Sequence, residues 1–335
     1  MRMLAVTNMY PTATRPYYGI FVKEFTGALE KLGVEVAVSF TDTSRGRGAY
    51  ITEVPRLRKT MAKKQHDVIH AHHTYSVWQT KLAQRLSRDK APVVFTTHEG
   101  ESLMPEGVRD EKADWLKRIV YLKQPKRWAL NAADYVVSVN EHIPKALGYR
   151  KPYDVIPPGV DLELFIPRNK SDCRKRLGIP EDETVVLFPA DPNNPFKGFD
   201  IVKKSLERLT RKTRVITGGD ISREDMPIYM NAADVVVQAS SVEASPMVAK
   251  EAMAVNVPMV STDAGDVGKI FGSAPGYYIC ERNPEDLAAK LETALGHKGE
   301  TRGRDQLQRL GLSLEQVAEK YLSIYKEVLR RSAAT

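Results

Sequence analysis

The sequence has little cysteine and no long apolar run. Cys173 and Cys280 are the two cysteines among 335 residues, and they stand far apart with no metal-ligand spacing around them. This pattern excludes a disulfide framework and is typical of a reducing cytoplasm. No apolar run approaches the ~20 residues that a membrane-spanning helix needs. Because a strand pattern begins at Met3, we also expect no signal peptide and a cytoplasmic location, peripheral at most on the inner face of a membrane.

Acidic residues are outnumbered, since 42 Asp and Glu face 50 Lys and Arg, a formal charge of +8. An acidic partner follows: nucleotide phosphates, anionic lipid or nucleic acid. Nucleic acid is the least supported of these, because the basic residues are scattered with no helix-turn-helix or aromatic RNA-binding signature. Two segments, 45–64 and 112–128, concentrate the basic residues. Solvated connectors are one interpretation of them, and contact with an anionic membrane surface is the other.

Short apolar runs alternate with helical segments along the whole chain, which predicts an α/β protein with parallel sheets. We place strands at 3–7, 34–40, 67–71, 92–97, 134–139, 153–156, 184–190, 214–220, 234–239, 257–262 and 276–280. The last helix is expected over 313–331, with one apolar face formed by Val317, Tyr321, Ile324, Tyr325 and Val328.

The stretch behind strand 234–239 carries two glutamates, Glu243 and Glu251, eight residues apart. Between them Ser245-Pro246 favours a helix start, with Ser as a cap and a helix from Met247 to Ala254. Glu243 would then lie at the carboxyl edge of the sheet, where ligands bind in such folds. The backbone N–H groups of Met247 and Val248 would suit an anion. Carboxylates beside an anion site favour a sugar nucleotide, although two solvated glutamates on a surface helix remain the alternative.

The run SSVEASPMVAKEAMAVNVP resembles the Glu-x7-Glu signature of family 4 glycosyltransferases, a retaining group with the GT-B fold, although Ala244 and Asn256 stand where the family usually has glycine. The resemblance implies that Glu243 approaches the donor sugar and Glu251 holds the ribose hydroxyls. Pro246, Met247 and Val248 would line the donor site. In the family, two Rossmann-like domains with parallel sheets face each other across a cleft.

Three further motifs extend the resemblance. His98, in VVFTTHEGE, matches the T-x-H loop whose histidine lines the donor-sugar pocket, so we assign it a catalytic role beside Glu243. Lys197-Gly198 opens a helix and suits a diphosphate. Gly218-Gly219 ends a strand in the loop that lies beside the nucleotide in the family. Asp191 stands near the position of the family's phosphate-binding arginine, which leaves the second cation unidentified.

The first loop, NMYPTATRPYYG, is long for a strand-to-helix connection and lines the acceptor cleft in the family. Tyr17, Tyr18 and Gly19 are therefore our acceptor-binding candidates, with ordinary packing of the tyrosines as the alternative. The run HAHH at 70–73 could suggest a metal, but no nearby cysteine completes a site, and we expect no metal.

We thus expect a GT-B protein with domains at 1–166 and 167–312, and a final helix, 313–335, crossing back onto the first. The expected reaction moves a sugar from a UDP- or GDP-linked donor to a hydroxyl of a glycan, glycolipid or polyprenyl-linked acceptor. Metal-dependent glycosyltransferases rely on Asp-x-Asp, which the chain lacks, so no cofactor is expected. The alternatives are a nucleotide-sugar epimerase of the same fold, or a non-catalytic protein that binds lipid or nucleic acid.

Overall fold

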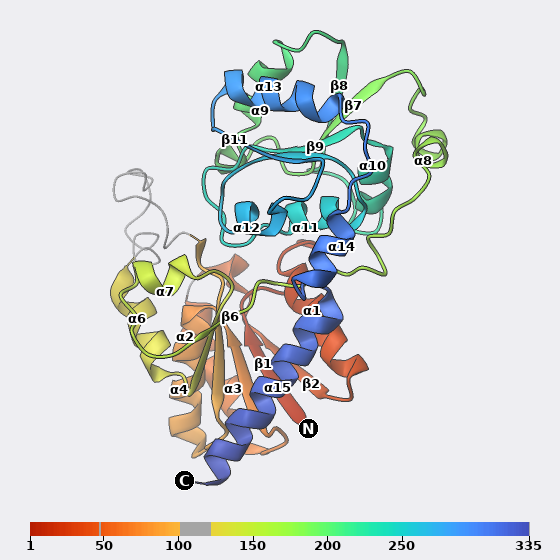
Figure 1. Cartoon of the computed structure of the whole chain (residues 1–335). Coiled ribbons are helices and arrows are strands. Elements are labelled where there is room, and N and C mark those ends of the chain that lie inside the picture. Colours follow the sequence, from red (N-terminus) through yellow and green to blue (C-terminus); the bar gives the residue numbers. More distant parts are fainter. Residues whose placement is uncertain (47, 101–121, 335) are drawn as a thin grey trace. The chain divides into compact units, whose positions relative to one another are not determined.

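The computed structural model describes residues 1–46, 48–100 and 122–334 (Figure 1). Internal contacts divide the chain into two compact units. The N-terminal unit comprises Met1–Gly159 with Leu314–Thr335, and the C-terminal unit comprises Val160–Ser313. In the part of the chain that is described, no helix is both long and apolar enough to cross a membrane.

The N-terminal unit is built on a six-stranded parallel sheet in the order β2-β1-β3-β4-β5-β6. Its strands are β1 (Arg2–Thr7), β2 (Glu35–Phe40), β3 (Val68–His72), β4 (Val93–Thr97), β5 (Tyr135–Ser138) and β6 (Asp154–Val155). Its helices are α1 (Ile20–Lys31), η1 (Thr43–Arg45), α2 (Ala49–Thr52), α3 (Val54–Ala62), α4 (Thr74–Ser87), α6 (Lys123–Ala132), α7 (His142–Ala146) and α15 (Leu314–Ala333). Both β3 and β4 are buried along their whole length, as expected for central strands with covered faces.

The final helix, α15, completes this unit. Its predicted apolar face is buried, and Tyr321 and Tyr325 share a core with Phe25 of α1 and with the central strands. Figure 1 shows α15 lying beside α1 along the sheet. Residues from the two ends of the sequence therefore form one hydrophobic core.

The basic segment after β2 is folded rather than an unstructured connector. Val54, Leu57 and Met61 are buried on one side of α3, while Arg58 and Lys59 are exposed on the other. Three apolar residues at helical spacing are enough to attach this short helix to α4. Of the second basic segment, 112–128, only 122–128 lies within the described residues.

The C-terminal unit holds a five-stranded parallel sheet in the order β11-β10-β9-β7-β8. Its strands are β7 (Thr184–Phe188), β8 (Thr213–Thr217), β9 (Val235–Gln238), β10 (Met259–Thr262) and β11 (Tyr277–Cys280). Its helices are α8 (Lys170–Leu177), η4 (Pro195–Lys197), α9 (Phe199–Leu206), α10 (Met226–Ala232), α11 (Met247–Ala254), α12 (Val267–Phe271), α13 (Pro284–Leu295) and α14 (Gly303–Arg309).

Each face of this sheet has its own core. On one face α9 and α13 pack over the strands, and on the other lie α11, α12 and α14, as Figure 1 shows. Residues 160–166, which the sequence assigned to the N-terminal domain, pack in this second core through Val160, Leu162 and Phe165. Their apolar side chains draw the segment into the C-terminal unit, so the division falls after Gly159.

Candidate active site

Lys197 and Glu243 meet at the carboxyl edge of the C-terminal sheet. Lys197 ends η4, directly before α9, and Glu243 lies in the loop between β9 and α11. The Lys197 ammonium donates a hydrogen bond of 2.6 Å to Glu243 Oε1. Both side chains are partly exposed, so a ligand can reach them. The structure therefore brings together the residue predicted to bind the diphosphate and the one predicted to approach the sugar.

Gly198 explains why a glycine follows that lysine. It caps the start of α9 with a φ of +73°, in the left-handed region. A Cβ at this position would lie 2.3 Å from the carbonyl oxygen of Ala239. Any other residue would push the head of α9 away from the end of β9.

At two neighbouring motifs, Asp191 and Gly218-Gly219, the structure shows contacts with other residues of the chain. Asp191 Oδ1 accepts hydrogen bonds from both the backbone and the side-chain nitrogen of Asn193, at 2.9 and 3.1 Å. A Cβ on Gly218 would lie 2.6 Å from the carbonyl carbon of Pro189, whereas one on Gly219 would meet its nearest neighbour at 3.4 Å. The absence of a side chain at Gly218 therefore allows the chain after β8 to pass close to the residue that follows β7.

Glu251, the predicted ribose ligand, is only 4% exposed and forms an ion pair with Arg223. The Arg223 guanidinium also lies over the ring of Phe165, 4.6 Å from its centroid. Sequence reasoning missed this arginine. The signal was its place in the loop between β8 and α10, which leaves the sheet at the same carboxyl edge as the Glu243 loop.

The start of α11 differs from the prediction in one detail. Pro246, not Ser245, is the N-cap residue, and its side chain makes no capping hydrogen bond. Met247 and Val248 lie in the first turn, where backbone N–H groups have no acceptor within the helix. Helix α11 therefore starts at the residue that the sequence predicted, without a capping serine.

Ser245 instead joins a buried polar network. Its hydroxyl donates to Asp266 Oδ2, and the Lys250 ammonium donates to the Ser245 oxygen, both at 2.7 Å. Burial lowers the pKa of Lys250 to about 8, although the charges of Asp266 and Glu251 act in the opposite direction. Burial likewise raises the pKa of Asp266. Sequence reasoning missed both Lys250 and Asp266, because a lysine in a short helix is usually expected to be solvated.

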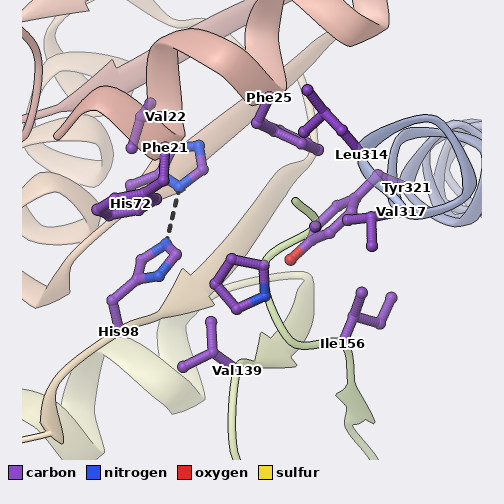
Figure 2. A pocket seen from close by; sticks show the side chains of 12 residues that line it. Phe21, Val22, Phe25, His72, His98, Val139, Ile156, Leu314, Val317 and Tyr321 are labelled. Atoms are coloured by element: carbon purple, nitrogen blue, oxygen red, sulfur yellow. Dashed lines mark hydrogen bonds between the residues drawn. The ribbon is translucent and has the colours of Figure 1, made fainter. Parts of the chain in front are cut away.

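In the N-terminal unit, His98 follows β4 and faces His72 of β3. Their ring nitrogens, His72 Nδ1 and His98 Nε2, share a hydrogen bond of 3.1 Å (Figure 2). Phe21 packs beside the His98 ring, with centroids 5.0 Å apart. These side chains line a cavity of about 20 Å³. That volume accommodates a water molecule but not a sugar ring.

His70, the first histidine of the HAHH run, belongs to the core. His70 Nε2 shares a hydrogen bond of 2.7 Å with Thr96, and Nδ1 shares one of 2.6 Å with the Tyr325 hydroxyl of α15. Its ring lies 4.0 Å from that of His72, because residues two apart on a strand face the same side. Burial lowers the pKa of His70 to about 3. Within 1–46, 48–100 and 122–334, no cluster of His, Cys, Asp or Glu could hold a metal ion.

The residue after His98 anchors the loop. Glu99 is 2% exposed and accepts hydrogen bonds from the backbone of Thr74, at 2.7 Å, and from the Thr97 hydroxyl, at 2.6 Å. Burial alone would raise the pKa of Glu99, but the charges of His73 and Lys126 and these hydrogen bonds lower it. Glu99 thus ties the end of β4 to the start of α4 and positions His98.

The predicted acceptor loop precedes α1. Tyr17 is 43% exposed, while the ring of Tyr18 is covered by the guanidinium of Arg15 at 3.9 Å. Gly19 is the N-cap residue of α1, with a φ of +72°, and a Cβ there would lie 2.2 Å from the carbonyl carbon of Met9. Of the three candidates, Tyr17 presents the most surface to a ligand.

Two family models match the chain. Glycosyltransferase Family 4 matches residues 18–164, and Glycosyl transferases group 1 matches residues 197–306. The first range falls in the N-terminal unit apart from its last residues, and the second lies wholly in the C-terminal unit. The second range also contains Lys197, Arg223, Glu243 and Glu251.

Individual proteins agree with these models. A protein of Bacillus subtilis named as a teichuronic acid biosynthesis glycosyltransferase, TuaC, is 25% identical over 87% of this chain and 88% of its own length. Sucrose-phosphate synthase from Thermosynechococcus elongatus superimposes with a TM-score of 0.81 at 19% identity, covering all of both chains. Anabaena Alr3699/HepE, solved in complex with UDP, superimposes with a TM-score of 0.71 at 18% identity, covering 97% of this chain and 99% of its own. The chain belongs to the family 4, group 1 glycosyltransferases and has the GT-B fold.

Proposed function

We propose that this glycosyltransferase transfers a sugar, with retention, from a UDP- or GDP-linked donor to a hydroxyl of a glycan, glycolipid or polyprenyl-linked acceptor. The observation that carries the proposal is the contact of Lys197 with Glu243 at the head of α9, together with Glu251 on α11. A nucleotide-sugar donor has further support from Anabaena Alr3699/HepE, which was solved with UDP and with UDP-glucose.

Each residue of the C-terminal unit has a distinct role in this proposal. Lys197 and the first-turn N–H groups of Met247 and Val248 hold the diphosphate and neutralise it as it departs. Glu251 accepts hydrogen bonds from the ribose hydroxyls, and Glu243 from the transferred sugar. Protein cations and a helix terminus can supply this neutralisation without a metal, so we propose that none is required.

The residues of the N-terminal unit complete the reaction. His98 contacts the transferred sugar, and Tyr17 with the loop before Gly19 contacts the acceptor. As the acceptor oxygen bonds to the anomeric carbon, the bond from that carbon to the diphosphate breaks on the same face. The departing phosphate oxygen takes the proton of the acceptor hydroxyl, so no separate general base is needed.

The test is incubation of the protein with a panel of UDP- and GDP-sugars without an acceptor. Slow release of free sugar and nucleotide, from one donor in preference to the others, is the expected result. An altered nucleotide sugar would identify an epimerase instead, and complete inertness would favour a binding protein. Repeating the active reaction in EDTA tests whether a metal ion is required. Activity that disappears and returns with Mg²⁺ would contradict a metal-free mechanism.

A further inference from the structure

A second, larger cavity lies in the C-terminal unit, where β9, β10 and β11 end. It has a volume of about 530 Å³ and is open to solvent. Small-molecule sites typically occupy a few hundred Å³, so this space could hold a monosaccharide. Polar residues that line it include Ser240, Ser241, Thr262, Asp263, Arg282 and Lys290.

This cavity lies next to the Lys197–Glu243 pair but does not include it. The backbone N–H of Ser241, on the cavity wall, donates 2.9 Å to the carbonyl oxygen of Phe196, the residue before Lys197. A ligand in the cavity would therefore be a neighbour of the proposed donor, separated from it by the chain at Phe196 and Ser241.

The cavity carries two cationic groups whose donors are available. Arg282 Nε donates to the carbonyl oxygen of Ala239 at 3.1 Å, which fixes the guanidinium at the cavity. Among the residues that the structure describes, neither its terminal nitrogens nor the Lys290 ammonium has a carboxylate partner. A fixed guanidinium with free terminal N–H groups suits bidentate binding of a carboxylate or phosphate.

Among the described residues, the acidic side chains around the cavity form no ion pairs with Arg282 or Lys290. Asp286 Oδ2 accepts from the backbone N–H of Glu281 at 2.7 Å, and Asp263 Oδ1 accepts from that of Gly268 at 3.2 Å. Glu281, the third acidic residue of the lining, accepts at Oε2 from the side-chain amide of Asn283 at 3.0 Å. Their other carboxylate oxygens can accept hydrogen bonds from hydroxyl groups. The mixture of bound carboxylates and available cations suits a ligand with several hydroxyls and one acidic group.

An unsatisfied hydroxyl supports a ligand at this place. Ser240 is 1% exposed and lines the cavity, and its hydroxyl oxygen has no hydrogen-bond partner within the described part of the protein. Buried hydroxyls in folded proteins are nearly always paired. A ligand oxygen that reached Ser240 would supply the missing partner.

We propose that this cavity is a binding site for an acidic sugar, one that carries a carboxylate or a phosphate beside its ring hydroxyls. Arg282 and Lys290 hold the acidic group, while Ser240 and the carboxylates of Asp263 and Asp286 bind hydroxyls. This site is separate from the proposed donor site. Binding of an acidic sugar to it can be measured whether or not the protein transfers sugar.

The test is a ligand-detected NMR titration of the full chain with D-glucuronate, glucose 6-phosphate, glucose and inorganic phosphate. At least one of the two acidic sugars should bind about tenfold more tightly than both glucose and inorganic phosphate, because a charge-assisted bond and ring-hydroxyl bonds act together. Equal binding of glucose would overturn the role of the cations. Equal binding of inorganic phosphate would reduce the site to a bare anion site and overturn the proposal, as would no binding at all.

Substitutions locate the site. Arg282→Gln should weaken binding of the acidic sugar about tenfold. Arg302 is an exposed arginine outside the cavity, so Arg302→Gln should leave that affinity unchanged. Lys197→Ala should also leave it unchanged. Binding that survives Arg282→Gln, or that is lost in Lys197→Ala instead, would place the ligand elsewhere and contradict the inference.

Discussion

At the scale of single residues, the main finding is that each proposed donor-binding carboxylate already has a cationic partner. Glu243 is paired with Lys197 and Glu251 with Arg223. A buried carboxylate without a partner is costly, and these ion pairs hold the carboxylate oxygens in place. In the proposed donor site, those oxygens would therefore be positioned for hydroxyl groups before a donor arrives.

We predict that Glu251→Gln weakens nucleotide binding, because an amide keeps one acceptor oxygen in place of two. Each lost charge-assisted bond is worth roughly 1.5–3 kcal/mol. Arg223→Gln should weaken binding too, since it releases the Glu251 carboxylate. Calorimetry on both single variants and the double variant forms a cycle, in which we expect the effects to be strongly non-additive.

Arg214→Gln is the matched control for that cycle, because Arg214 pairs with Glu183 on an exposed surface. It should leave nucleotide affinity unchanged. Additive effects of the Glu251 and Arg223 substitutions would show that Arg223 does not act through Glu251.

A second residue-scale prediction concerns Lys197. Removing it takes away the proposed diphosphate cation and leaves Glu243 without its partner, close to where the phosphates would lie. We expect Lys197→Ala to slow transfer by roughly 10²–10³, the scale of losing one preorganised donor. Lys203→Ala, on the exposed side of α9, should be neutral. A mild effect at Lys197 in steady-state kinetics would mean that another cation holds the diphosphate.

At the scale of elements, the network of Ser245, Lys250 and Asp266 connects α11 to the loop after β10. It fixes the first turn of α11, whose N–H groups are the proposed phosphate ligands. Removing one member of a buried ionic network leaves the others unpaired. We predict that Lys250→Met lowers the free energy of unfolding by about 3 kcal/mol in urea denaturation at pH 7.

The pH dependence of the free energy of unfolding tests whether Lys250 is responsible. The pKa of Lys250 is lowered to about 8 in the fold from an ordinary value of 10.5, so the unfolded chain binds more protons between those pH values. Its unfavourable contribution is therefore fully present below pH 8 and fades as the pH rises toward 10.5. This rise in stability should be absent in Lys250→Met. The same slope in both proteins would assign it to another group.

The contact of α15 with β3 and β4 leads to an acid-sensitivity prediction. His70 is fully buried between Thr96 and Tyr325, with Phe25, Tyr321, His72 and His98 around it, and its pKa is lowered to about 3 from 6.5. Between those pH values the unfolded chain binds the extra proton. The N-terminal unit should thus lose roughly 1.4 kcal/mol per pH unit as the pH falls below 6.5.

His70→Gln should reduce that slope in denaturant titrations between pH 4 and 6.5, whatever it does to stability at pH 7. If His70→Gln retains the full slope, the acid sensitivity comes from another residue.

At the scale of the whole molecule, the net positive charge is partly concentrated on α3. Arg56, Arg58, Lys59, Lys63 and Lys64 are exposed on or beside this helix, and Ile51 next to it is 65% exposed. An exposed apolar residue among cations suits an anionic lipid surface.

We predict salt-sensitive binding to vesicles that contain phosphatidylserine. Each basic residue near the surface contributes about 1 kcal/mol, so neutralising Arg58, Lys59, Lys63 and Lys64 to Gln should weaken binding by roughly 10³ in flotation at low ionic strength. Lys203→Gln with Lys204→Gln, on α9, serves as the control. Wild-type protein that stays unbound at low salt would contradict membrane association.

Much of the fold followed from local pattern. The strand at 234–239, the turn at Pro246 and the helix from Met247 to Ala254 appear as β9 and α11 because period and turn chemistry act over a few neighbouring residues. Helix α3 was missed for a related reason. Its three apolar residues, Val54, Leu57 and Met61, stand among so many basic ones that the helical period was weak.

The sequence by itself determined which side chains reach the carboxyl edges of the sheets: Lys197, Glu243 and His98 each follow or precede an element that local pattern identifies. Only the tertiary structure decided which residues pair with one another. Arg223 reaches Glu251 across 28 residues and Tyr325 reaches His70 across 255. Such pairs depend on strand order and on how helices pack over the sheet. These are set by burial summed over the whole core, so no local stretch of sequence specifies them.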